Sequence, residues 1–174
     1  MTDQKPEDPL DTLGDVYEKL YENIVKDLHE SKEKTAEVFH KIIDKARDEA
    51  VELGEVSSEE AEKLAEYLRR DLSDLINSAS KTGRELKDWL GFETTLLETE
   101  ILDRLLDVAD PTIVEWTKFK LESQPTPAWH TGEITGPGTL VCDSCGEKLH
   151  FYKAGKIPPC PKCHGTSFHR TIEI

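Results

Sequence analysis

Four cysteines in two Cys-x-x-Cys pairs are the feature that most constrains this chain, which has no other cysteine. The pairs are Cys142 with Cys145 and Cys160 with Cys163, and fourteen residues separate them. Two residues between cysteines allow both sulfur atoms of a pair to face one ion, and zinc binds four thiolates tetrahedrally at about 2.3 Å. Paired motifs at about this separation are typical of zinc sites. The spacing therefore predicts one structural zinc ion bound by all four cysteines.

The residues that follow each pair bear on the shape of the site. Gly146 follows the first pair, where a tight turn needs a residue that tolerates a positive φ. His164 follows the second pair at the same place, and Gly165 comes one residue later. Two alternatives stay open here. His164 could replace a cysteine ligand, and iron of the rubredoxin type could replace zinc, because ligand type alone does not separate these metals.

Disulfide bonds are the other structural use of paired cysteines, and they form in oxidising compartments. The sequence starts without an apolar signal stretch, and it contains no run of about 20 apolar residues that could span a membrane. We therefore expect reduced thiols in a cytoplasmic protein without membrane contact. A redox-active pair is also disfavoured, because this region lacks the βαβ context of such motifs.

The formal net charge is −14, and the acidic excess lies entirely before residue 125. Residues 125–174 hold five of the 22 basic residues and four of the 36 acidic residues, about +1. The remaining 17 basic and 32 acidic residues give residues 1–124 a charge of −15. Such a field repels a phosphate backbone at long range, so nucleic-acid binding by the whole chain is disfavoured.

Residues 10–53 contain no proline, and apolar or small side chains recur there every three or four residues. This spacing predicts one long amphipathic helix, roughly 60 Å in length at 1.5 Å per residue, with Gly54 just after its end. The predicted seam consists of Leu13, Tyr17, Leu20, Ile24, Leu28, Ser31, Thr35, Val38, Ile42, Ala46 and Ala50.

A second long helix is predicted to start near Ser58, because Ser57 and Glu60 have the spacing of a capping box. Its apolar positions alternate steps of four and three over four heptads, as in a coiled coil. A short turn makes the two helices antiparallel, so we expect a long hairpin with an acidic tip at Glu55, Glu59 and Glu60. The second seam is Ala61, Ala65, Leu68, Leu72, Leu75, Ala79, Thr82, Leu86 and Trp89.

Two shorter helices are expected after Gly91, one over residues 95–109 and one that begins at Pro111. Proline and glycine then become dense over residues 123–138, which predicts a linker at about 123–128 and a domain boundary near Gln124. Strands are expected at 129–134, 139–141, 148–152 and 167–172. A part of about fifty residues rarely holds a sheet unaided, so the metal must stabilise it.

The predicted fold class is therefore α+β and multidomain. An acidic domain over residues 1–124 consists of a long antiparallel helical hairpin or coiled coil with shorter helices. An all-β, rubredoxin-like zinc ribbon follows over residues 125–174. Replacement of Cys142 or Cys160 by Ser is expected to unfold the ribbon and leave the helices largely intact.

The stretch from Trp129 to Gly146, the second pair with its prolines at 158–163, and the final Phe168-His169-Arg170 together resemble the bacterial zinc-ribbon-containing proteins of the YbeL type. The acidic N-terminal helices are similar in kind, so the resemblance covers nearly the whole chain. It implies a four-cysteine zinc ribbon and does not point to an activity.

A helical part joined to a four-cysteine domain is also similar to rubrerythrin-like proteins. Their di-iron site draws a Glu-x-x-His motif from each of two helices. The predicted helices contain this motif once, as Glu37 and His40, and both residues flank the seam. We therefore expect no di-iron site and interpret the two residues as a solvated pair.

Two binding functions remain as alternatives. The acidic tip joined to a ribbon resembles transcription factors that enter the secondary channel of RNA polymerase, although acids at a helix N-terminus also stabilise its dipole without a partner. The ribbon alone carries cations and aromatic rings of the kinds that bind nucleic acid, although its charge near +1 disfavours this. These residues are His130, His150, His164, His169, Lys148, Lys153, Lys156, Lys162 and Arg170, with Phe151, Tyr152 and Phe168 as stacking groups.

The sequence contains no phosphate-binding loop, nucleophile elbow or catalytic triad spacing, so we predict no enzymatic activity and no catalytic residue. The main hypothesis is a scaffold that binds protein partners through the helices and the ribbon. Self-association through apolar surface left uncovered on the hairpin is a further expectation.

Overall fold

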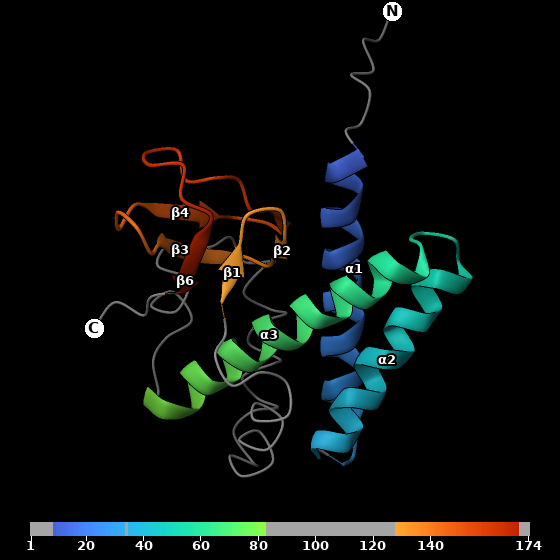
Figure 1. The fold of residues 1–174 in the computed structure, drawn as a ribbon. Helices are drawn as coiled ribbons and strands as arrows, with labels where there is room; N and C mark the ends of the chain where they lie inside the picture. The colour runs from blue at the N-terminus through green and yellow to red at the C-terminus, as the bar shows by residue number, and fades with distance from the viewer. Residues whose placement is uncertain (1–8, 34, 83–127, 171–174) are drawn as a thin grey trace, which may run out of the picture.

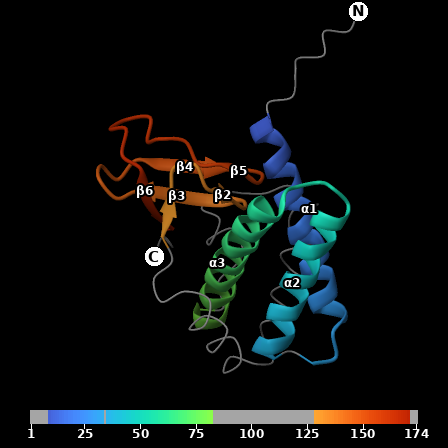
Figure 2. The same ribbon diagram turned by 45° about the vertical axis from the view of Figure 1, so that its right-hand side comes forward.

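The computed structural model describes residues 9–33, 35–82 and 128–170 (Figure 1). The helices of this part are α1 (Pro9–Glu30), α2 (Ala36–Glu52) and α3 (Ser58–Thr82). Each helix runs back along the one before it, and the strands lie against α1 and α3 (Figures 1 and 2). Three predictions lie outside the residues or side chains that the structure describes. They are the shorter helices, the domain boundary near Gln124 and the seam from Leu75 onward.

The prediction of one long helix over residues 10–53 is wrong, because the chain turns back between Glu30 and Ala36. Ser31 and Thr35 have seam spacing but serve in the turn. The Ser31 hydroxyl donates to the carbonyl oxygen of Glu33 at 2.7 Å, and the Thr35 hydroxyl accepts from the Val38 N–H at 3.3 Å as the N-cap of α2. Small hydroxyl residues satisfy helix ends in this way, and periodicity alone does not distinguish this role. Within the described ranges, the result is three helices instead of a long two-helix hairpin.

The break also changes which face of α2 is buried. Phe39 and Ile43 are each 1% exposed and belong to the helical core, whereas the predicted seam residues Val38 and Ile42 are half-buried. Ala46 and Ala50 are buried as predicted. The steps from Phe39 to Ala50 are four, three and four, so the helical period holds within α2 but starts one residue later than predicted.

The start of α3 is confirmed in detail. The Glu60 carboxylate accepts from the N–H of Ser57 at 2.9 Å and from its hydroxyl at 2.8 Å, while the Ser57 hydroxyl accepts from the Glu60 N–H at 3.3 Å. This is the reciprocal bonding of a capping box. Gly54 has a φ of 69°, as expected for a residue that ends α2. Seam residues Ala61, Ala65, Leu68 and Leu72 are all buried.

The strand-rich region contains two small antiparallel sheets within the described residues. One has the order β1-β6-β3-β4 and the other pairs β2 with β5. The strand bounds are β1 (Trp129–His130), β2 (Ile134–Thr135), β3 (Gly138–Cys142), β4 (Lys148–Phe151), β5 (Gly155–Lys156) and β6 (Ser167–Arg170). The predicted single strand at 129–134 is therefore two strands, and the short β5 was not predicted. Cys142 at the end of β3 pairs with Phe168 of β6, which places the first cysteine pair at the rim of the larger sheet.

The helices and the strands share one apolar core. Ile134 of β2 and Ala154, between β4 and β5, are 3% and 6% exposed, and both belong to the cluster formed by the helices. A second cluster lies inside the ribbon and joins Trp129, Leu140, Phe168 and two of the cysteines. The described parts of the two predicted domains thus pack face to face, with α1 and α3 on β2 and β5 (Figure 2).

Candidate metal centre and its junction with the helices

Two turns of the same design hold the cysteines. In the first, the Gly146 N–H donates to the Cys142 carbonyl at 2.9 Å, and in the second the His164 N–H donates to the Cys160 carbonyl at 2.9 Å. Gly146 has a φ of 73° and His164 a φ of 61°. The position after each pair therefore needs the left-handed region, which glycine adopts without strain and histidine adopts only when its surroundings impose it. His164 takes the backbone role of the missing glycine.

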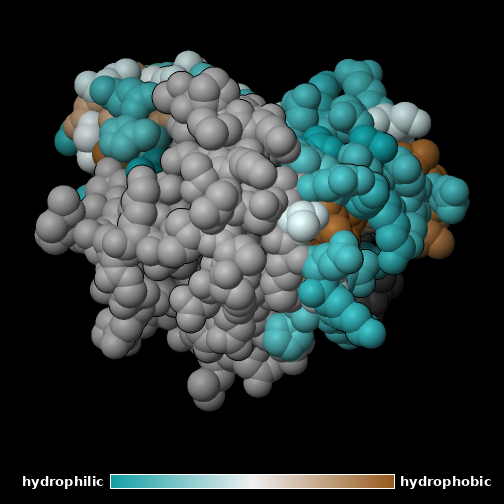
Figure 3. All heavy atoms as spheres, turned by 90° about the horizontal axis from the view of Figure 1, so that it is seen from below, coloured by the Kyte–Doolittle hydropathy of each residue, from teal (hydrophilic) through white to brown (hydrophobic). Residues whose placement is uncertain are grey.

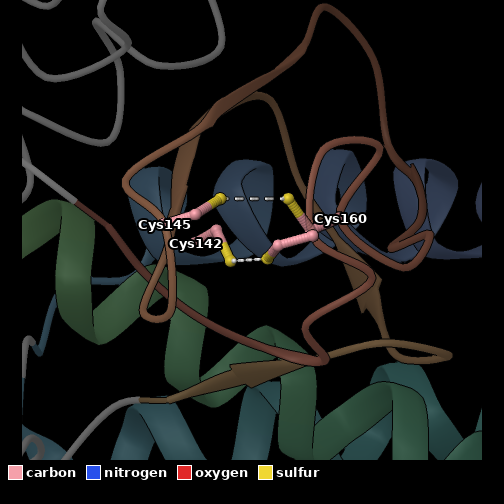
Figure 4. A group of neighbouring side chains, drawn as sticks. Cys142, Cys145 and Cys160 are labelled. Carbon is pink, nitrogen blue, oxygen red and sulfur yellow. Dashed lines mark hydrogen bonds between the residues drawn. The ribbon is translucent and has the colours of Figure 1, made fainter.

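The four sulfur atoms converge on one point between these turns. Cys142 Sγ lies 3.5 Å from Cys163 Sγ, Cys145 Sγ lies 3.6 Å from Cys160 Sγ, and all four lie within 4.8 Å of one another (Figure 4). Four bonds of 2.3 Å in a tetrahedron place the sulfur atoms about 3.8 Å apart. The observed spacing therefore fits a single metal ion. The exposed side chain of His164 is not part of this ligand group.

Gly165 is the glycine that the site requires for space. A Cβ atom at this position would lie 3.1 Å from Cys142 Sγ and 3.2 Å from Cys163 Sγ. The Gly165 N–H also points toward Cys163 Sγ at 3.4 Å. The glycine displaced by one residue from the expected position thus lets the backbone approach the sulfur atoms, while His164 makes the turn.

The ionisation of the thiols favours a bound cation. Burial raises the pKa of the Cys160 thiol, but N–H groups of Cys163 and Lys162 and contacts with neighbouring cysteines outweigh burial and lower it to about 7. The Gly165 N–H lowers the pKa of Cys163, yet the other three cysteines and burial raise it to about 12. Four thiols this close cannot all ionise without positive charge between them, and thiolates are the form that binds metal.

A buried carboxylate, Asp71 of α3, joins the ribbon to the helices. Asp71 Oδ1 accepts from Trp129 Nε1 at 2.9 Å, and Oδ2 accepts from the Gly136 N–H at 2.9 Å. Tyr17 of α1 donates its hydroxyl to Oδ2 at 2.5 Å. The side chain of Asp71 is 3% exposed. One carboxylate thus connects α1, α3 and the first strands of the ribbon.

Arg70 completes this junction on the side of β2. Its Nε donates to Asp71 Oδ1 at 2.9 Å, and its Nη2 donates to the Ile134 carbonyl at 2.9 Å. Its Nη1 donates to Glu133 Oε2 at 2.5 Å. The guanidinium also lies 5.0 Å from the centre of the Trp129 ring, within cation–π range. The Arg70 side chain is 97% buried, and its charge is tolerated there because each guanidinium nitrogen atom donates to an oxygen atom.

Arg170 approaches the same indole from the last strand. Its guanidinium carbon lies 5.3 Å from the centre of the Trp129 ring, and its Nη1 donates to the Pro137 carbonyl at 2.9 Å. Its Nε lies 3.4 Å from Asp74 Oδ2. Two cations and one carboxylate therefore surround Trp129, which packs with the apolar cluster that includes Cys142 and Cys160. The metal centre and the helices are connected through this side chain.

The charges at the junction fix its protonation. Burial raises the pKa of Asp71, but the charges of Arg70 and Arg170 and hydrogen bonds from Tyr17 and Arg70 outweigh burial and hold the pKa below its ordinary value. Burial and the neighbouring Asp71 carboxylate raise the pKa of Tyr17 well above its ordinary value. Asp71 is ionised and Tyr17 neutral at physiological pH, so the hydroxyl donates to a carboxylate and the bond is charge-assisted.

The predicted acidic tip does not present uncommitted carboxylates. Glu55 forms an ion pair with Lys19, Glu59 pairs with Lys63 at 2.8 Å, and Glu60 caps α3. Similarly, Glu37 pairs with Lys41 at 2.5 Å on the exposed face of α2. Of the residues that the structure describes, only the four cysteines form a group of three or more metal-binding side chains.

The predicted nucleic-acid face of the ribbon is wrong in two of its members. Phe168 is 1% exposed inside the ribbon core, and Arg170 is 9% exposed and directed at the helices. Several of the remaining lysine and histidine side chains lie beside acids. His130 lies 3.4 Å from Glu133, Lys162 lies 3.5 Å from Glu147 and His169 lies 2.5 Å from Asp143. Tyr152 is the one predicted stacking group with high exposure, at 60%.

Sequence reasoning missed the junction residues as functional side chains. Asp71 is not among the residues that the sequence analysis singles out, although it lies three residues after Leu68 and therefore at seam spacing. A carboxylate at a core position is the signal that could have found it, because buried charges are paired. Its partners Trp129 and Arg170 lie too far along the chain for any local pattern to reveal.

Comparison with known proteins agrees with this geometry. Residues 26–172 match the family model described as "Zinc-ribbon containing domain", which covers most of the chain and both cysteine pairs. The chain belongs to this zinc-ribbon family. The resemblance to the YbeL type that the ribbon sequence indicated is thereby confirmed, and the four clustered thiols support zinc binding.

Relatives of this zinc-ribbon protein occur in Escherichia coli. The protein named "Uncharacterized protein YbeL" is 27% identical over 152 residues in strain K12, which covers 87% of this chain and 94% of the relative. The proteins of the same name in strains O6:H1 and O157:H7 give the same values. Neither these names nor the family description mentions an activity. No solved structure matches the chain. None of the helices in the described ranges has the length and apolar character needed to cross a membrane.

Proposed function

We propose that this protein is a non-enzymatic, cytoplasmic interaction module in which a structural zinc ion on Cys142, Cys145, Cys160 and Cys163 holds the ribbon against the helices. The observation that carries the proposal is the convergence of four thiols within 4.8 Å. A tetrahedral ion with four protein ligands has no open position for a substrate, which is typical of structural sites. A cytoplasmic location keeps the thiols reduced.

The role of the metal follows from the size of the ribbon. The larger sheet has strands of two to five residues, and its apolar cluster includes Cys142 and Cys160 themselves. Such a small sheet has little apolar surface to bury, so the free energy of metal binding becomes folding free energy. Zinc is proposed over iron because the family model is a zinc ribbon.

The interaction role is supported by the surface that the metal-stabilised fold presents. Seen from below, the described part of the surface is mainly hydrophilic, with apolar side chains in small areas (Figure 3). The chain carries a net charge of −14, and a field of this sign attracts basic partner surfaces and repels nucleic acid. We propose a protein partner with a basic contact surface. A second copy of the chain carries the same negative charge, so self-association would depend on apolar contacts instead.

Crosslinking with reciprocal tagging tests this role. The tagged protein is crosslinked in the cells that make it, and each captured partner is then tagged in turn. The proposal expects one partner that captures the chain reciprocally, with crosslinks to a single face and loss of capture as ionic strength rises. Crosslinks between differently tagged copies would identify self-association. Failure of every reciprocal capture would overturn the interaction role.

A further inference from the structure

A cavity of about 340 Å³ lies where the helices meet the strands, apart from the four-cysteine site. Its walls come from α1, the first turns of α3, the turn between β1 and β2, and β5. Small-molecule sites have volumes of roughly 300 to 1,000 Å³ and occur preferentially where two parts of a fold meet. The cavity has the size and the position of a binding site for a compact ligand.

The inner wall of the cavity is apolar. Leu64 of α3 and Ile134 of β2 line it and are 2% and 3% exposed, and Leu13 of α1 is half-buried beside them. Tyr67 adds an aromatic ring, and its hydroxyl has no hydrogen-bond partner within the described ranges. This wall provides contact for an apolar group, and the hydroxyl is a donor at its edge.

Two lysines line the same cavity. Lys63 of α3 pairs with Glu59 at 2.8 Å, but both side chains are more than half exposed, and such pairs contribute little, so Lys63 can change partner. Lys156 of β5 has no carboxylate partner among the residues described.

Glu60 is the acid among the lining residues, and it is already bonded. Its carboxylate accepts from the N–H and the hydroxyl of Ser57, and these bonds hold its pKa below the ordinary value. The three charged side chains of the cavity therefore sum to +1, with the positive groups available to a ligand and the negative group used in the helix cap.

We infer that this cavity binds a small organic carboxylate, with its apolar body against Leu64 and Ile134 and its carboxylate between Lys156 and Lys63. This function goes beyond the proposed interaction role. The helices supply one side of the cavity, and the β1–β2 turn, β2 and β5 supply the other side, so the site exists only when the ribbon is packed on the helices.

Titration of the full-length, zinc-loaded chain with octanoate tests the inference, with 1-octanol as the matched neutral probe. Backbone amide NMR signals report both binding and folding. Octanoate is expected to shift the signals of Leu64, Gly132 and Lys156 in a saturable manner, and 1-octanol to bind up to about fivefold more weakly, the effect of one exposed ion pair. Lys156→Gln is expected to weaken octanoate binding by up to about fivefold.

Lys153→Gln is the matched control, because Lys153 is an exposed lysine three residues away that does not line the cavity. It is expected to leave octanoate binding unchanged. Lys63→Gln is the second variant if Lys156→Gln disturbs the spectrum as a whole. Equal binding of 1-octanol, full binding by both cavity variants, or the absence of saturable shifts would overturn the inference. These outcomes are read on purified protein and are independent of partner capture.

Discussion

Replacement of Asp71 by Asn tests whether the junction holds the ribbon on the helices. The substitution keeps the size of the side chain and removes its charge. Asp71 accepts hydrogen bonds on both oxygens, with Arg70 and Trp129 donating to Oδ1 and Tyr17 and Gly136 donating to Oδ2. Whichever oxygen becomes an amide NH2 group, at least one N–H donor, that of Gly136 or those of Arg70 and Trp129, then faces a donor.

The magnitude follows from the burial of the partners. Arg70 is 3% exposed and Arg170 is 9% exposed, and both lose the carboxylate that balances them, although Glu133 and Asp74 remain nearby. Removal of one partner from a buried ion pair costs about 3–5 kcal/mol. We expect Asp71→Asn to lower the free energy of unfolding by about this amount, a large part of the roughly 5–15 kcal/mol that stabilises a domain.

Urea unfolding followed by far-ultraviolet circular dichroism measures this change on the zinc-loaded protein. Asp48→Asn is the matched control, because Asp48 pairs with Arg47 on the surface and its side chain is 63% exposed. Exposed pairs contribute about 0–1 kcal/mol, so the control should stay within that range. A loss for Asp71→Asn no larger than that of Asp48→Asn would refute the reasoning.

Three further predictions concern single contacts. Tyr17→Phe should cost about 1.5–3 kcal/mol at neutral pH, because a donor to the charged Asp71 is lost. The raised pKa of Tyr17 gives a stabilisation that is complete below about pH 10, the ordinary pKa of tyrosine, and is lost as pH rises toward the folded-state pKa. The free energy of unfolding of Tyr17→Phe should therefore decline less steeply above about pH 10 than that of the parent. An equal decline would contradict this. Ser57→Ala should cost about 1 kcal/mol in urea unfolding through loss of the capping box, and no loss would argue against that cap. Gly165→Ala should weaken zinc binding in competition with a chromophoric chelator, since its Cβ would lie 3.1 Å from Cys142 Sγ, whereas unchanged affinity would show that the turn adjusts freely.

The local signals in the sequence predicted local structure well. The capping box at Ser57 and Glu60, the end of α2 at Gly54 and the strand that leads into Cys142 are confirmed, because each depends on residues a few positions apart. The cysteine spacing predicted the cluster for the same reason. Each Cys-x-x-Cys motif defines its own turn, and only the approach of the two turns to each other depends on the tertiary fold.

Two kinds of feature were not predictable from the sequence: a choice between two possible local roles of a residue, and contacts between residues far apart in the chain. Ser31 and Thr35 fit a helical seam and a helix cap equally well, and only the packing of α2 back onto α1 selects the cap. The contacts of Asp71 with Trp129 and Gly136 join residues 58 and 65 positions apart. This packing also changes the expectation for the cysteine variants, since loss of the ribbon now removes part of the helical core.

The metal content of freshly purified protein tests the central claim most directly. Inductively coupled plasma mass spectrometry, combined with the protein concentration, gives the ions bound per chain. The account predicts one zinc ion per chain, and less than one in a Cys160→Ser variant prepared in parallel, because that site keeps three thiolates. Iron in place of zinc, or a parent protein without stoichiometric metal, would contradict the proposal of a structural zinc ion that holds the ribbon on the helices.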